Sequence, residues 1–123
     1  METYTLVRPE HLNHYGYLFG GVLLKWIDEC AFLTAAKNFR GVSFVTVAMD
    51  KIVFKHQVAN GSVLRFKVEP VKQGTTSITY EVKVFGDAPC AEREQEVFST
   101  NITFVSIDKN GRPTPLPHKL DIS

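Results

Sequence analysis

This 123-residue sequence has few cysteines, no long apolar run and almost no excess of either charge. Two cysteines, Cys30 and Cys90, are too few for a disulfide framework, and no paired CxxC or histidine cluster indicates a zinc site. No stretch approaches the roughly 20 apolar residues of a membrane span, and the first residues form no apolar signal core. Lys and Arg number 14 against 13 Asp and Glu, so no overall field attracts nucleic acid or an anionic membrane. We therefore expect a cytoplasmic protein with no bound metal, no nucleic-acid partner and no membrane partner.

Several motifs of known enzyme classes are also missing. The sequence has no GxSxG nucleophile elbow, no GxxxxGK[ST] phosphate loop and no GxGxxG fingerprint. Its 44% hydrophobic and 22% charged residues suit one folded domain that spans residues 1–123. A chain of this size has little room to enclose a deep pocket by itself, so we expect it to form an oligomer.

One long helix is expected from Gly21 to Asn38. Apolar residues recur there at spacings of three and four, as in Leu24, Ile27 and Ala31. Other apolar side chains lie nearly all round the same helical wheel. The pattern therefore predicts a helix that is buried on several sides.

The remaining chain has the alternation of β-strands. A short strand is expected at residues 3–7, and four longer strands after the helix at residues 42–54, 62–71, 77–85 and 96–107. Short turns join the last four strands, which makes them antiparallel. The sequence thus predicts an α+β protein with a hotdog fold, a curved antiparallel five-stranded sheet wrapped around one long central helix.

The best candidates for chemistry lie in the loop before the helix and inside the helix. Gly20 and Gly21 occupy the helix start, where the N–H groups have no acceptor inside the helix. These N–H groups could stabilise a developing oxyanion, or the two glycines could serve only to form the turn into the helix. Asp28 lies on the apolar side of the helix, where a carboxylate is costly unless it is paired or faces a cavity. A purely structural Asp, bonded to a neighbouring backbone or subunit, explains the position equally well. Asn13 and His14 are further polar candidates in the loop.

The order of these residues resembles a family signature. Asn13-x-x-Gly16-x-x-Phe19-Gly20-Gly21, with Asp28 seven residues later, is similar to the signature of hotdog acyl-CoA thioesterases, in the YciA-like and cytosolic acyl-CoA hydrolase branch. The resemblance continues through the strand after the helix, the turn at Gly74 and the closing segment, roughly over residues 6–117.

The resemblance implies hydrolysis of an acyl-CoA thioester to a carboxylate and free coenzyme A, with no cofactor beyond the coenzyme A of the substrate. Asp28 would be the general base or the nucleophile. Asn13 of a facing subunit would place the water or the substrate, and the N–H of Gly20 or Gly21 would polarise the thioester carbonyl.

The resemblance also implies the partners and the position of the coenzyme. The minimal unit would be a homodimer that assembles into a hexamer as a trimer of dimers. The nucleotide end of coenzyme A would lie along the segment that contains Lys72, Gly74, Thr75, Thr76 and Ser77. A non-catalytic acyl-CoA-binding or regulatory module is the alternative, whereas a hotdog dehydratase is disfavoured because the helix contains no histidine.

Overall fold

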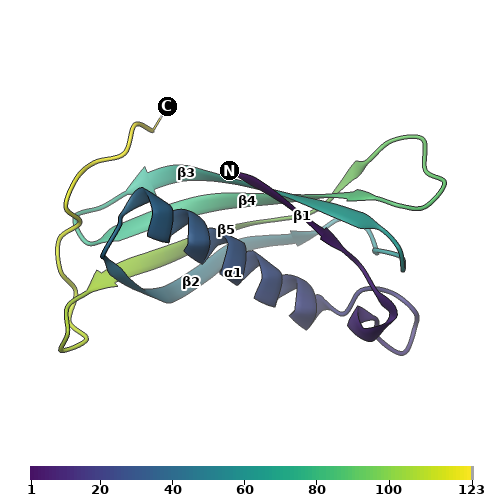
Figure 1. Cartoon of the computed structure of the whole chain (residues 1–123), viewed down its shortest axis with the longest axis horizontal. Coiled ribbons are helices and arrows are strands. Elements are labelled where there is room, and N and C mark those ends of the chain that lie inside the picture. The colour runs from purple at the N-terminus through teal and green to yellow at the C-terminus, as the bar shows by residue number, and fades with distance from the viewer. Residues whose placement is uncertain (123) are drawn as a thin grey trace.

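One long helix lies across one face of a five-stranded antiparallel sheet in the computed structural model, which describes residues 1–122 (Figure 1). The elements are β1 (Glu2–Leu6), η1 (Pro9–His11), α1 (Gly20–Asn38), β2 (Ser43–Phe54), β3 (Val63–Gln73), β4 (Ser77–Asp87) and β5 (Gln95–Ile107). The strand order is β1-β3-β4-β5-β2, and each neighbouring pair is antiparallel. The predicted fold is confirmed, and α1 and the five strands each begin and end within two residues of their expected positions, whereas the short helix η1 was not expected.

The core lies between α1 and the inner face of the sheet. Alternation along β3, β4 and β5 turns every second, mostly apolar, side chain toward the helix, and these side chains are buried. Phe104 lies at the centre of an aromatic group, with its ring 6.1–6.3 Å from the rings of Phe32, Phe44 and Tyr80. The buried Tyr80 hydroxyl donates a hydrogen bond of 2.7 Å to Asn38 Oδ1, so its polar group is paired.

The helix α1 is buried on one side only. Its buried residues form one face toward the sheet: Leu23, Ile27, Cys30, Ala31, Thr34 and Ala35. Away from that face, Phe32 is 42% exposed and Leu33 is 54% exposed. The expectation of a helix buried on several sides is therefore wrong for the single chain, because the sheet covers only one side of α1. Across residues 1–122, no helix is both long enough and apolar enough to cross a lipid bilayer.

The edge strand β2 differs from the inner strands because most of its 12 residues are exposed. It pairs with β5 on one side and with no other strand of the described chain. Its exposed apolar residues are Val45, Val47, Ile52, Val53 and Phe54. A long apolar edge with unpaired backbone groups is a template for pairing with another chain.

The two thiols lie in opposite environments. Cys30 is buried in α1, and burial raises the pKa of its thiol to about 12, whereas Cys90 is exposed in the loop between β4 and β5. We expect one thiol per native chain to react quickly with a disulfide reagent near pH 8 and a second only after denaturation, because the reactive form is the thiolate. A Cys90→Ser variant should show no fast thiol, and two fast thiols in the native protein would contradict the burial of Cys30.

The raised pKa of Cys30 also sets the sign of a pH effect on stability. Between pH 9 and pH 12 the folded chain retains a proton on this thiol that the unfolded chain loses. Stability should therefore fall as the pH rises through this range, and unfolding by urea at several pH values measures it.

Candidate active site

Asp28 lies on the flank of α1 that faces β2. The Thr46 hydroxyl on β2 donates a hydrogen bond of 2.8 Å to Asp28 Oδ1. Asp28 is half-buried, and with Glu29, Phe32 and Thr46 it lines a cavity of about 170 Å³. The other carboxylate oxygen has no hydrogen-bond donor within the described chain. The carboxylate is thus held at one oxygen and left free at the other, which suits it to take a proton or to attack a substrate.

Thr46 was not among the residues expected from the sequence. It lies 18 positions after Asp28. Threonine is common in strands for reasons of β-propensity, so nothing in the sequence distinguishes Thr46 as a site residue. Only the packing of α1 against the start of β2 brings its hydroxyl to the carboxylate.

Two backbone donors are free at the start of α1. The N–H groups of Val22 and Leu23 bond to the Phe19 carbonyl at 3.0 Å and 3.2 Å. Those of Gly20 and Gly21 find no acceptor within residues 1–122, and they lie at the positive end of the helix dipole. A Cβ at Gly21 would lie 2.7 Å from the Phe19 ring, so a side chain there would displace that ring. The helix start therefore offers two N–H groups without an acceptor to an anionic or partly charged oxygen.

Asn13 shapes the loop that precedes the helix. Its Oδ1 accepts hydrogen bonds from the N–H groups of Tyr15 at 2.9 Å and Tyr17 at 3.2 Å. The side-chain carbonyl is therefore engaged inside the loop, and the side-chain amide is the half that remains able to donate to a substrate or a water. The neighbouring His14 is exposed and stacks on Tyr15 with ring centroids 4.0 Å apart.

The two halves of this site lie apart within one chain. Asp28 lies seven positions after Gly21 in α1, which corresponds to about 10 Å along the helix axis. An oxyanion donor must lie about 3 Å from the carbonyl oxygen, and a base must reach the water that attacks the same carbonyl. The free amides and Asp28 of one chain therefore do not act on one thioester.

The turn Gly74–Ser77, expected to bind coenzyme A, supports the C-terminal segment of the chain. The Thr75 carbonyl accepts the N–H of Leu116 at 2.8 Å, and the Thr76 carbonyl accepts the N–H of Ser106 at 2.8 Å. These contacts join the β3–β4 turn to the end of β5 and to the segment after it.

Lys72 belongs to a different surface. It lines a groove of about 410 Å³ together with Asp50, Lys51 and outward-facing residues of β4 and β5. The structure therefore places Lys72 on the outer face of the sheet, whereas the Gly74–Ser77 turn contacts the C-terminal segment.

One helix on one face of a five-stranded antiparallel sheet, with a carboxylate on the helix flank and free amides at the helix start, defines a hotdog-fold protein. A family model described as "Thioesterase superfamily" matches residues 15–89, which include α1 and β2 to β4. The chain belongs to the thioesterase superfamily.

Two curated relatives illustrate the similarity. The chain is 37% identical over 101 residues to acyl-coenzyme A thioesterase 11 of Mus musculus. The aligned residues make up 82% of this chain and 17% of that protein. It is 32% identical over 117 residues to the acyl-CoA thioester hydrolase YciA of Salmonella typhimurium, covering 92% of this chain and 86% of that one. The chain also spans 64% of the hydrolase YkhA of Bacillus subtilis and 30% of the rat cytosolic acyl coenzyme A thioester hydrolase. Some relatives are therefore much longer than this chain.

Two solved structures are similar throughout most of the chain. An acyl-CoA hydrolase of Staphylococcus aureus, in complex with butyryl coenzyme A and coenzyme A, is 29% identical with a TM-score of 0.85, covering 95% of this chain and 71% of that one. A hexameric hotdog fold thioesterase of Campylobacter jejuni is 30% identical with a TM-score of 0.84, covering 93% and 87% of the two chains.

Proposed function

We propose that the chain is an acyl-CoA thioester hydrolase, which adds water to the thioester and releases a carboxylate and coenzyme A. One observation carries the proposal. The Thr46-bound carboxylate of Asp28 lies near the start of an unpaired edge strand, and the free amides of α1 lie near its end. The names of the relatives and the coenzyme A complex of the Staphylococcus aureus structure support the same chemistry.

The active unit is a pair of chains joined through β2. Asp28 contacts Thr46 at the start of β2, and Gly20 lies beside Phe54 at its end, where an added Cβ would be 3.8 Å from the Phe54 ring. Antiparallel pairing of two β2 edges reverses this order in the second chain. Asp28 of one chain then approaches the free amides of the other, and the apolar side chains exposed on β2 become buried.

Further assembly of such dimers is expected. The Campylobacter jejuni thioesterase is hexameric, and this chain matches 87% of its length. We therefore expect three dimers in one particle, a state that sedimentation or light scattering measures directly.

The proposed reaction needs only the substrate and water. Asp28 takes a proton from a water molecule, and the water oxygen bonds to the thioester carbon. The carbonyl oxygen gains negative charge, which the N–H groups of Gly20 or Gly21 of the other chain stabilise, while the Asn13 amide donates to the water or the carbonyl. The C–S bond then breaks and the sulfur leaves with the proton as free coenzyme A. Direct attack by Asp28, with a mixed anhydride that water later opens, uses the same groups, and ¹⁸O entry into Asp28 during a single turnover distinguishes it.

A thiol-release assay tests the proposal. Purified protein should liberate free thiol from at least one member of a panel of short, medium, long and aromatic acyl-CoAs. Binding of acyl-CoA without thiol release at any chain length would instead favour the non-catalytic binding module.

The role of Thr46 is to position the carboxylate. Thr46→Val removes the hydroxyl that donates to Asp28 while keeping the shape of the side chain. A hydrogen bond to a charged group contributes about 1.5–3 kcal/mol, so we expect kcat to fall roughly tenfold or more with little change in KM. Thr46→Ser should restore the rate, because it restores the donor.

A matched control separates this role from a general effect on the sheet. Thr103 on β5 bonds to Thr79 through its hydroxyl at 2.8 Å, on the face away from α1. Thr103→Val should therefore keep the wild-type kcat. A Thr46→Val variant with wild-type kcat would show that the hydrogen bond to Asp28 has no part in the reaction.

A further inference from the structure

The edge strand β2 contains a β-bulge in its second half. The register of its pairing with β5 shifts between Asp50 and Val53, where Lys51 and Ile52 lie opposite Thr100 alone. The buried Thr100 hydroxyl donates a hydrogen bond of 2.7 Å to the Asp50 carbonyl. A side chain of the neighbouring strand therefore holds the backbone of the bulge.

The residue inside the bulge has an unfavourable backbone conformation. Lys51 has a φ of +52°, in the left-handed region where a side chain crowds the backbone. Glycine relieves this crowding and is the usual choice at such a position. A lysine at a strained position indicates a use for its side chain that glycine does not provide.

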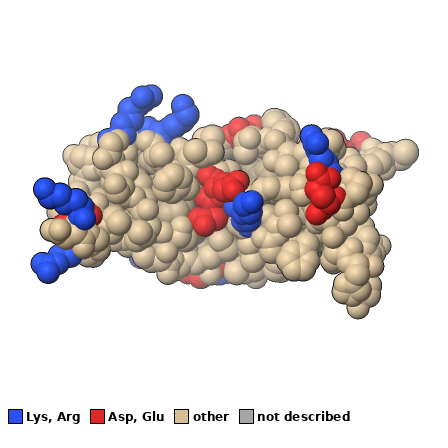
Figure 2. Space-filling view, turned by 60° about the horizontal axis from the view of Figure 1, so that its bottom comes forward, with Lys and Arg blue, Asp and Glu red and all other residues tan. Residues whose placement is uncertain are grey.

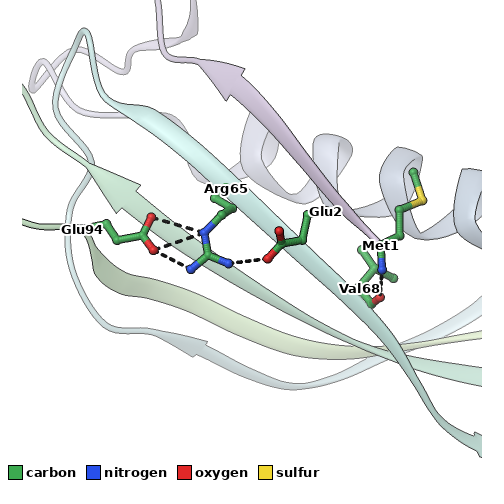
Figure 3. Close-up of polar contacts among 5 residues, drawn as sticks. All are labelled: Met1, Glu2, Arg65, Val68 and Glu94. Atoms are coloured by element: carbon green, nitrogen blue, oxygen red, sulfur yellow. Dashed lines mark hydrogen bonds and ion pairs between the residues drawn. The ribbon is translucent and has the colours of Figure 1, made fainter.

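The bulge turns Asp50 and Lys51 toward the same face of the sheet. Regular alternation places neighbouring side chains on opposite faces, whereas both of these residues line the groove of about 410 Å³ on the outer face. Within residues 1–122 neither forms an ion pair, not even with the other. Arg65 shows the contrast, because its guanidinium is held between Glu2 at 2.6 Å and Glu94 at 2.5 Å (Figure 3).

Asp50 and Lys51 are also the only charged residues in the sequence of β2. Figure 2 brings the lower side of Figure 1 forward, and most of the surface that it shows is neither acidic nor basic. An uncharged edge with one carboxylate and one ammonium group is complementary to the same edge turned by a twofold rotation. The charges therefore favour a second copy of this chain as the partner.

The proposed active site fixes where two such edges cross. Asp28 bonds to Thr46, and Gly20 at the start of α1 lies beside Phe54. Asp28 of one chain meets the free amides of the other only if Thr46 lies opposite the other chain's Phe54. Asp50 is four positions from each of these two residues, so the twofold axis passes beside it. The two Asp50 carboxylates then face each other.

We infer that Asp50 and Lys51 set the register of the dimer, with Lys51 of each chain bound to Asp50 of the other across the twofold axis. The inference rests on the proposed function, because the position of the axis follows from a site shared by two chains. The bulge gives the strained lysine its use. It brings the ammonium group to the face where two carboxylates would otherwise repel each other, and a long lysine side chain spans the diagonal between paired strands.

Cysteine cross-linking locates the axis without any turnover. In a Cys90→Ser background, single cysteines replace the outward-facing residues Val45, Ala48, Asp50 and Val53 in turn. Pairing about residue 50 puts the two copies of positions 48, 53 and 45 about 13, 20 and 33 Å apart along the strands. A disulfide needs Cα atoms within about 7 Å, so we expect the covalent dimer only, or by far the fastest, at position 50. Fastest cross-linking at any other position would overturn the inference.

Charge reversal tests the ion pairs. Asp50→Lys puts four cations at the axis, and Lys51→Asp puts four carboxylates there. We expect the Kd of the dimer to rise on the order of 10²-fold or more in each variant, with a matching loss of thiol release at low protein concentration. An equimolar mixture of the two variants should form dimers and regain the activity, because each chain then meets the opposite charge. This rescue separates repulsion at the axis from misfolding of either chain.

Lys67→Asp is the matched control, since it makes the same change of charge as Lys51→Asp on the inner strand β3. It should keep the wild-type mass by light scattering and the wild-type rate. Wild-type dimers in both reversal variants, or no recovery on mixing them, would overturn the inference and leave the proposed function intact. If the wild-type protein releases no thiol from any acyl-CoA, the proposed function fails, and the cross-linking and the masses still decide the position of the axis.

Discussion

Asp28→Asn is expected to lower kcat for acyl-CoA hydrolysis by roughly 10²–10⁴-fold and to leave coenzyme A binding unchanged. The Asn side chain keeps the size of Asp and keeps an oxygen that accepts the Thr46 hydroxyl, so the contact between α1 and β2 persists. It cannot take a proton from water or attack a thioester. Thiol release measures kcat, and calorimetry with free coenzyme A measures binding.

Glu29 provides the comparison for this variant. It is the neighbouring carboxylate, it lines the same cavity, and it lies 4.0 Å from Lys25 in an exposed i,i+4 pair. Because an exposed pair of this kind contributes little, Glu29→Gln should retain most of the activity and the fold. Loss of activity in Glu29→Gln together with normal turnover in Asp28→Asn would show that Glu29 is the reacting carboxylate, and it would refute the proposed role of Asp28.

Val47→Lys is expected to separate the subunits and to lower kcat by about 10²-fold or more. Val47 lies on the edge strand β2, is 53% exposed in the single chain, and occupies a position where the pairing with β5 shifts register. A lysine at the centre of an apolar edge opposes pairing with a second edge. A separated chain keeps Asp28 but lacks the partner's free amides, and loss of an oxyanion donor costs about 10²–10³-fold in rate. Light scattering gives the mass, and thiol release gives the rate.

The control for the edge strand is a valine of similar exposure on an inner strand. Val63 on β3 is 41% exposed and pairs with Leu6 of β1 and Asp87 of β4. Val63→Lys should keep the dimer and the activity. A Val47→Lys protein that is monomeric and fully active would show that one chain contains a complete site, and the proposed pairing through β2 would be wrong.

The strands and the helix were predictable because their signals are local. The alternation of apolar and polar residues along 62–71 and 77–85 indicates a strand with one buried face. Apolar residues spaced three and four apart indicate a helix, and neither signal depends on the rest of the chain. The burial of the helix was not predictable in the same way. Phe32 and Leu33 are apolar and exposed because the sheet of one chain covers only one side of α1. An apolar residue in a sequence does not distinguish contact with its own sheet from contact with another subunit.

The site shows the same division. Gly20, Gly21 and Asp28 could be proposed from the sequence, because helix ends and a carboxylate among apolar residues are recognised by position along the chain. Asn13 was also proposed from the sequence. The sequence did not reveal that Asn13 Oδ1 accepts hydrogen bonds from the N–H groups of Tyr15 and Tyr17. The assignment of Lys72 to the coenzyme stays a prediction, and the structure places that side chain on the outer face of the sheet.

By itself the sequence determined which segments form strands, where the helix starts, and that a carboxylate stands among its apolar residues, since each follows from the spacing of neighbouring residues. Only the tertiary structure decided that Thr46 meets Asp28, that β2 is a free edge, and that Asp50 and Lys51 line one groove. Each of these depends on the strand order β1-β3-β4-β5-β2 or on the register of β2 against β5. The alternation of apolar and polar residues along the chain does not indicate which strand lies at the edge of the sheet, because several strand orders bury the same apolar faces equally well.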